Sequence, residues 1–134
     1  DWSSDVCSSD LQVIGDDYLV TSVALIEAAV RDKACNAVLL KPNQVGTLTE
    51  THQAMLSARA AGMGMVVSAR SGETEDTAIV HLATGWNTGQ LKVGSFARSE
   101  RMAKWNEGLR IESSPAFTGK FARIEGLAFK SDRP

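Results

Sequence analysis

Cysteine is scarce in this chain of 134 residues, and long apolar runs are missing. The two cysteines, Cys7 and Cys35, lie far apart without CxxC or Cys/His spacing, so they predict neither a zinc site nor a disulfide framework. A reducing cytoplasm is therefore the expected compartment. The longest apolar runs, such as residues 34–40, fall far short of the roughly 20 residues that a membrane helix needs. We therefore expect no membrane span.

A strong excess of charge of one sign is also missing. The chain has 14 Lys and Arg against 16 Asp and Glu, a net charge of -2 that provides no general attraction for nucleic acid or an anionic membrane. Any anion site therefore has to be local, and we expect no nucleic-acid partner. The hydrophobic fraction of 43% is sufficient for the packed core of one modest domain, or of a piece of a larger one.

Residues 1–10, DWSSDVCSSD, have neither apolar periodicity nor the basic and apolar regions of a signal peptide. The segment back-translates into a common sequencing-adapter oligonucleotide. We therefore expect residues 1–10 to be non-native and exclude them from the fold. On this interpretation the natural protein continues upstream of Leu11, and the chain is the downstream part of a longer gene.

Apolar segments alternate with segments of helical periodicity over residues 11–113. The predicted strands are residues 11–15, 37–41, 64–68 and 89–94. The predicted helices follow them at 23–33, after Thr47, after Gly72 with Glu73, Glu75 and Asp76 in the first turn, and at about 99–111. This alternation is typical of a parallel sheet buried on both faces. Residues 114–134 lose the periodicity and are expected to form a C-terminal surface tail, held down by Phe117 and Phe121.

Two α/β architectures fit four consecutive βα units. A doubly wound open sheet favours a glycine-rich phosphate loop, and neither GxGxxG nor GxxxxGK[ST] is present. A TIM-type (β/α)8 barrel instead carries its chemistry at the carboxyl ends of the strands, and here these ends carry Asp16, Lys41, Arg70 and Lys92. We therefore predict the C-terminal half of such a barrel, an incomplete one of four βα units.

The four charged strand-end residues are expected to converge on one mouth of the barrel. Three positive charges brought together are costly unless an anion or a metal ion compensates them. The cluster therefore predicts a multiply anionic ligand. The alternative is that each residue is simply a solvated loop residue.

The segments that contain these residues resemble a known family. DDYLVT, LLKPNQVGTLTE, VVSARSGETEDT and GQLKVGSFARSERMAKWNEGLRIE are similar, in order and spacing, to the four C-terminal blocks of the enolases, over Leu11 to Glu112. The resemblance implies a magnesium-dependent carbon–oxygen lyase, phosphopyruvate hydratase. Such an enzyme dehydrates 2-phosphoglycerate to phosphoenolpyruvate in glycolysis, in the cytoplasm and as a homodimer.

The resemblance also implies roles for individual residues. Asp16 matches a magnesium ligand, and Lys41 matches the general base that removes the α-proton of 2-phosphoglycerate. Arg70 and Ser71 match the loop that meets the phosphate, with Ser71 also near a second magnesium ion. Lys92 matches the lysine that contacts the substrate carboxylate and the developing enediolate. A lysine base that acts together with magnesium is a general property of this superfamily, so the pairing is part of what the resemblance implies.

The chain departs from the family at Ala69, where a substrate-contacting histidine is usual. This change favours altered rate or specificity and leaves open a sister lyase that acts on another carboxylate. The general acid and the other metal carboxylates belong upstream of this region, so we expect the fragment alone to be inactive. A non-catalytic structural or protein-binding descendant is a further alternative, against which the retained strand-end charges argue.

Several neighbouring residues have simpler interpretations. We interpret Asp17 as a turn or helix-capping residue rather than a ligand, and Ser71 has the alternative of being only a loop hydroxyl. Structural or packing roles are expected for His52, His81, Trp86 and Trp105. In the segment Arg98 to Arg101, we expect structural ion pairs rather than catalysis.

Overall fold

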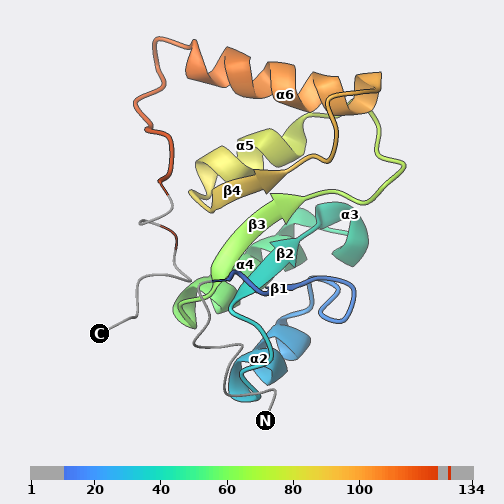
Figure 1. Ribbon diagram of the computed structural model, residues 1–134, viewed down its shortest axis with the longest axis vertical. Coiled ribbons are helices and arrows are strands. Elements are labelled where there is room, and N and C mark those ends of the chain that lie inside the picture. Colours follow the sequence, from blue (N-terminus) through green and yellow to red (C-terminus); the bar gives the residue numbers. More distant parts are fainter. Residues whose placement is uncertain (1–10, 124–126, 128–134) are drawn as a thin grey trace.

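The computed structural model describes residues 11–123 and 127 (Figure 1). In this part of the chain, four parallel strands form one sheet in the order β1-β2-β3-β4. The strands are β1 (Ile14–Gly15), β2 (Ala37–Leu40), β3 (Gly64–Ser68) and β4 (Gly89–Lys92). The helices are α2 (Val23–Arg31), α3 (Pro42–Val45), α4 (Leu48–Ala60), α5 (Ala78–Gly85) and α6 (Ser99–Glu112).

The strand order identifies the architecture. Each strand lies beside the strand that precedes it in the sequence. In the described part of the sheet the strand order does not reverse, whereas in a doubly wound sheet it does. Helix α4 packs on β2 and β3, and α5 packs on β3 and β4. Figure 1 shows both helices behind the sheet, with α6 along one end of the molecule. This is the arrangement of consecutive βα units in an incomplete TIM-type barrel, as predicted.

The two central strands are buried along their whole length, as expected for parallel strands covered on both faces. Alternate residues separate the faces. Val38, Leu40, Met65 and Val67 join the main core with residues of the helices. The residues between them, such as Leu39 and Val66, belong to the opposite face, which corresponds to the interior of a barrel. The outer strands are less buried than the prediction of uniformly apolar strands implied.

Local sequence signals mark the starts of α4 and α3. Thr47 caps α4 through its side-chain oxygen, which accepts a hydrogen bond from the Glu50 backbone N–H at 3.1 Å, as the capping-box pattern predicted. Lys41 is extended, also as predicted, but Pro42 then opens the short helix α3, which the sequence analysis missed.

Helix α5 begins later than predicted. Its first residue is Ala78, so Glu73, Glu75 and Asp76 lie in the preceding loop rather than in the first helical turn. The Asp76 carboxylate accepts a hydrogen bond from the Ala78 backbone N–H at 2.7 Å. The acidic residues therefore shape the loop that follows β3, and Asp76 supports the entry into the helix.

The prediction for the C-terminal segment is partly wrong. Phe121 is 95% exposed and does not hold the segment against the domain, whereas Phe117 is half-buried. Residues 124–126 and 128–134 of the predicted tail, like the predicted adapter segment 1–10, lie outside the described residues. None of the helices in the described part combines the length and apolar character needed to span a membrane.

Candidate active site

The register of the sheet brings three polar residues to one level at the carboxyl ends of the strands. Leu40 pairs with Val67, and Ser68 pairs with Lys92, so Lys41 lies beside Ser68 and next but one to Lys92. Because neighbours in register point to the same side of a sheet, these three residues share the face that corresponds to the barrel interior. The convergence therefore follows directly from strand pairing.

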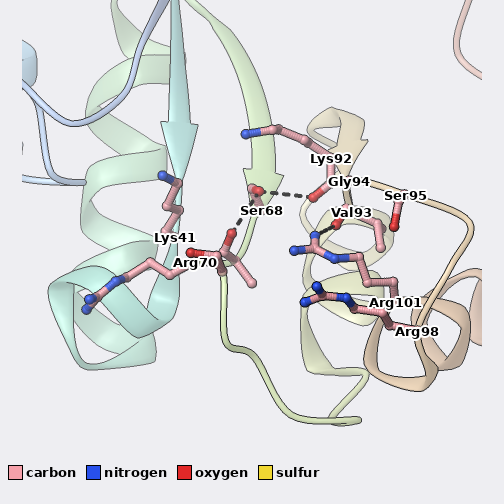
Figure 2. A pocket seen from close by; sticks show the side chains of 11 residues that line it. Lys41, Ser68, Arg70, Lys92, Val93, Gly94, Ser95, Arg98 and Arg101 are labelled. Atoms are coloured by element: carbon pink, nitrogen blue, oxygen red, sulfur yellow. Dashed lines mark hydrogen bonds between the residues drawn. The ribbon is translucent and has the colours of Figure 1, made fainter.

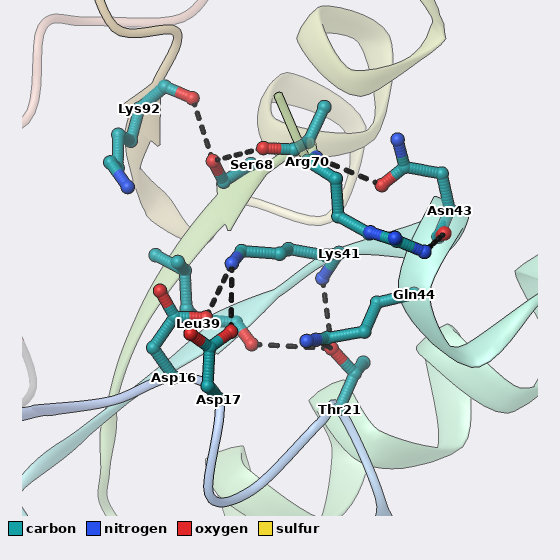
Figure 3. A network of polar contacts seen from close by, with 11 residues as sticks. Asp16, Asp17, Thr21, Leu39, Lys41, Asn43, Gln44, Ser68, Arg70 and Lys92 are labelled. Atoms are coloured by element: carbon teal, nitrogen blue, oxygen red, sulfur yellow. Dashed lines mark hydrogen bonds and ion pairs between the residues drawn. The ribbon is translucent and has the colours of Figure 1, made fainter. Parts of the chain in front are cut away.

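Lys41 is held in an ion pair with Asp16, the first residue after β1. Its Nζ lies 2.5 Å from Asp16 Oδ1, and the lysine side chain is only 8% exposed. Asp17 is a more distant partner at 3.8 Å, and its side chain is 91% exposed. A buried ammonium group is costly without a partner, and Asp16 supplies that partner. Figure 3 shows both carboxylates facing the end of the lysine side chain.

Arg70 is anchored from α3, the helix that directly follows Lys41. The Arg70 backbone N–H donates to Asn43 Oδ1 at 3.0 Å, and its guanidinium donates to the Asn43 backbone carbonyl at 3.5 Å. Asn43 Nδ2 in turn donates to Glu73 at 3.4 Å. On the far side of the same loop, the buried Lys104 of α6 donates to the Thr74 carbonyl at 2.7 Å. The loop after β3 is therefore tied to two different helices.

A pocket of about 630 Å³ opens at this end of the sheet. Its charged lining residues are all cationic in the described part of the chain: Lys41, Arg70, Lys92, Arg98 and Arg101. Figure 2 shows these side chains around the mouth, from the ends of three neighbouring strands and the start of α6. We call the last four residues the cationic wall. No carboxylate of residues 11–123 and 127 forms an ion pair with the wall, so the pocket is suited to a ligand with several negative charges.

The loop between β4 and α6, which carries Arg98 of the wall, is held by Arg101. The Arg101 guanidinium donates to the Val93 carbonyl, and Ser68 Oγ donates to the Lys92 carbonyl at 3.0 Å. Gly94 has a φ of 111°, and a Cβ there would collide with the Arg101 guanidinium. The prediction that Arg98 and Arg101 form structural ion pairs is wrong, since the ion pairs of the described residues involve neither arginine.

The remaining predicted residues lie as follows. Ala69 and Ser71 line the pocket, beside Arg70 on the loop after β3. His81 contacts Glu107 of α6 at 2.9 Å, and the ring centroids of His52 and Trp86 are 5.4 Å apart. Trp105 stacks on Phe96 with centroids 5.1 Å apart and donates to the Ser95 carbonyl. These contacts support the structural roles expected for the histidines and tryptophans.

The residues fit the predicted magnesium ion in part. Asp16 has a half-buried carboxylate and Ser71 an exposed hydroxyl, and both are oxygen donors of the kind that Mg²⁺ prefers. Mg²⁺ is commonly held by one or two carboxylates, with water and substrate oxygens completing the octahedron. Residues 11–123 and 127 contain no group of three or more His, Cys, Asp and Glu that could hold a metal ion. Asp16 therefore fits as one ligand among others.

Comparison with known proteins identifies the family. Residues 2–130 match the family model described as "Enolase, C-terminal TIM barrel domain". The chain belongs to the enolase C-terminal TIM barrel family. It is 50% identical to Enolase 1 of Methylococcus capsulatus over 118 residues, which are 88% of this chain and 28% of that protein. It is 57% identical to Enolase of Anaplasma marginale over 102 residues, 76% of this chain and 24% of that protein.

The match confirms the predicted resemblance and the predicted fold class. The chain spans about a quarter of the length of these enolases. The family match includes most of residues 1–10, which the sequence analysis set apart as non-native. Thr21, whose hydroxyl accepts a hydrogen bond from the Lys41 backbone N–H at 3.0 Å, and Asn43 were not predicted to belong to the site. Both lie inside the enolase-like segments DDYLVT and LLKPNQVGTLTE, and this position was the available signal.

Proposed function

We propose that the protein containing this chain is a phosphopyruvate hydratase, a carbon–oxygen lyase that interconverts 2-phosphoglycerate and phosphoenolpyruvate in glycolysis. One observation carries the proposal: a buried lysine paired with a carboxylate borders a pocket whose other charged residues are all cationic in the described chain. The lysine suits proton transfer, and the cations suit a substrate with a phosphate and a carboxylate.

The chemistry assigns different tasks to the two sides of this site. Lys41 accepts the α-proton of 2-phosphoglycerate in its neutral form, which the like charges of Lys92 and of bound Mg²⁺ would favour over the ammonium. Asp16, 2.5 Å from the Lys41 Nζ, stabilises the ammonium that forms on proton transfer. Proton removal next to a carboxylate creates a dianionic aci-carboxylate. Lys92 stabilises this developing charge, while Arg70 and Ser71 bind the phosphate. Fixed positive charge in a preformed pocket achieves this without reorganisation at the moment of reaction.

Magnesium is the proposed cofactor. When bound, Mg²⁺ supplies Lewis-acid stabilisation of the substrate carboxylate oxygens. In this chain, Asp16 would hold one ion and Ser71 would contact a second. Because residues 11–123 and 127 offer no complete set of metal ligands, we propose that the 134-residue chain alone is inactive. The other ligands and the general acid belong to the remainder of an enolase.

The direct test is phosphoenolpyruvate formation by the full-length protein, with and without Mg²⁺. We expect turnover of 2-phosphoglycerate that disappears with a chelator and returns with Mg²⁺. Loss of turnover in Lys41→Ala, with turnover retained in a variant of the exposed Lys120, would assign the base. Full turnover in Lys41→Ala would refute the assignment.

Ala69 supports a second candidate from the same superfamily. It lines the pocket beside Arg70 with a methyl group that can neither donate a hydrogen bond nor carry charge. A lyase acting on a non-phosphorylated carboxylate would need fewer cationic contacts at that end. Turnover of such an acid, together with failure on 2-phosphoglycerate, would favour this candidate. A non-catalytic descendant would instead show no thermal stabilisation by Mg²⁺.

The setting of the protein is also a proposal. The scarcity of cysteine supports the cytoplasm, and the balanced charge supports a small-molecule substrate rather than nucleic acid. The family supports a homodimer. Sedimentation of the full-length protein tests the dimer, and a nucleic-acid binding assay at low salt tests the absence of that partner.

A further inference from the structure

The loop between β1 and α2 contacts Lys41 at two separate points. Its first residue, Asp16, pairs with the side-chain ammonium group. Five residues later, Thr21 meets the backbone: the Lys41 N–H donates to Thr21 Oγ1 at 3.0 Å. Figure 3 shows Asp16 and Thr21 on the same loop, approaching opposite ends of Lys41.

Thr21 is fixed more tightly than a loop residue needs to be. It is 1% exposed, and its hydroxyl has two acceptors, Gln44 Oε1 at 3.2 Å and the Leu39 carbonyl at 3.4 Å. A hydroxyl has one proton and two lone pairs, so it can donate to one of these groups while it accepts from Lys41. The donor–acceptor arrangement therefore gives the hydroxyl a defined orientation beneath Lys41.

The backbone around Thr21 is strained. Val20 and Thr21 have φ values of 44° and 59°, in the left-handed region that β-branched residues rarely adopt. The Asp16 carbonyl accepts hydrogen bonds from the N–H groups of Leu19 and Val20, both at 3.0 Å, so the loop closes on itself. This tight turn returns the chain to Lys41. Strain of this kind persists where the surrounding structure enforces it, and it is frequent at functional sites.

From these contacts we infer that Thr21 is a positioning residue for the proposed base Lys41. Thr21 is not among the residues that line the pocket, and it acts by fixing the backbone from which the lysine side chain extends. The inference rests on the proposed function, because it is the base role that makes the position of Lys41 matter. A displacement of the base by about 1 Å is sufficient to lower the rate of proton transfer by one to two orders of magnitude.

The test compares Thr21→Val, which keeps the shape and removes the hydroxyl, with Thr21→Ser, which keeps the hydroxyl. In the full-length protein, we expect Thr21→Val to lower kcat about tenfold with KM within about twofold of the wild type. Thr21→Ser should restore kcat to within about threefold. Should the valine variant not fold, Thr21→Ala removes the same hydroxyl with less crowding at this φ and carries the comparison.

The matched control is Thr51→Val. Thr51 is also fully buried, but its hydroxyl donates to the Thr47 carbonyl at 2.7 Å, at the start of α4 and away from Lys41. A merely destabilising loss of a buried hydroxyl should affect both valine variants alike. An unchanged kcat in Thr21→Val, or an equal loss of kcat in Thr51→Val, would overturn the inference.

A second measurement does not depend on catalysis. Acetylation by a water-soluble succinimidyl ester, followed by peptide mass spectrometry, reports the accessibility of each lysine. We expect Thr21→Val to raise the acetylation rate of Lys41 about fivefold relative to Lys104, which is also buried and serves as the internal reference. If the wild type fails to turn over 2-phosphoglycerate, the proposed function fails and this ratio alone decides. An unchanged ratio would then overturn the positioning role.

Discussion

The two sides of the pocket are built on opposite principles. On one side, which we call the base side, the buried Thr21 and Lys41 lie with the half-buried Asp16, and the carboxylate matches the charge of the lysine. On the other side, the cationic wall presents arginine and lysine side chains that are mostly exposed and have no acidic partner in the described part of the chain. The first arrangement is complete without a ligand, whereas the second one needs an anion to balance it.

This difference shows how one cluster of strand-end residues can combine proton transfer with the binding of a charged substrate. A group that transfers a proton has to be held in one position, which burial and hydrogen bonds achieve. A surface that attracts a charged substrate has to remain accessible, so its cations gain their full partners only on binding. Substitutions on the base side, and of Lys92 because it stabilises the developing charge, should therefore change kcat, whereas substitutions of the arginines in the wall should change KM.

The largest effect is expected from Lys41→Ala in the full-length protein. Removal of a general base should lower kcat by about 10³-fold, while KM changes little because the wall remains intact. Stopped assays of phosphoenolpyruvate formation over a range of 2-phosphoglycerate concentrations measure both constants. A variant in which KM rises and kcat is retained would reverse the proposed division between the two sides.

Arg70→Ala should weaken substrate binding by the cationic wall instead. Loss of a guanidinium that binds phosphate costs about 1.5–3 kcal/mol, which corresponds to a rise of roughly tenfold to a hundredfold in KM. The KM of Arg70→Lys should lie between those of Arg70→Ala and the wild type, because lysine keeps the positive charge but cannot make the bidentate hydrogen bonds of a guanidinium. Inhibition by inorganic phosphate provides an independent binding constant. Equal KM values in the three proteins would remove Arg70 from the site.

Gly94→Ala sharpens the comparison within the wall. A methyl group there meets the Arg101 guanidinium and also occupies a backbone with a φ of 111°. We expect Arg101 to lose the Val93 carbonyl and the loop to shift, with KM raised about fivefold and the Asp16–Lys41 pair unaffected. Gly85, which has open space around it, provides the matched control as Gly85→Ala. A larger loss in kcat than in KM would show that the two sides are coupled.

The smallest effect should come from Thr47→Ala, outside both sides. Loss of the cap on α4 should lower the free energy of unfolding by about 1 kcal/mol without changing kcat or KM. Urea unfolding measures the first quantity, and the kinetic assay measures the others. A change in kcat as large as that of the Thr21 variants would mean that general destabilisation explains both.

Much of the fold could be predicted because it depends on local patterns. The apolar segments that form β2 and β3 and the capping box at Thr47 are readable from neighbouring residues, and the structure has these elements in the predicted places. The errors concern helix boundaries, which the neighbouring residues in the sequence do not determine. Pro42 can follow an extended residue and also begin a helix, and here it does both. The acidic residues before α5, Glu73, Glu75 and Asp76, are as compatible with a first helical turn as with the loop that they form.

The candidate site likewise contains residues that could be predicted from the sequence and residues that could not. The strand-end residues Lys41, Arg70 and Lys92 could be predicted to meet, because parallel strands end at one edge. The residues that hold them could not. Thr21 and Asn43 bond to partners 20 and 27 residues away, and these contacts depend on a strained turn and on the short helix α3. Such contacts follow from the assembled structure and leave no periodic signal.

The central claim is that Lys41 removes a proton from a phosphorylated acid held by the cationic wall. Exchange of the α-proton of 2-phosphoglycerate with deuterated solvent, followed by proton NMR in the full-length protein, isolates this step from the loss of hydroxide. We expect rapid exchange in the wild type and none above the uncatalysed rate in Lys41→Ala. Exchange at the wild-type rate in Lys41→Ala would contradict it.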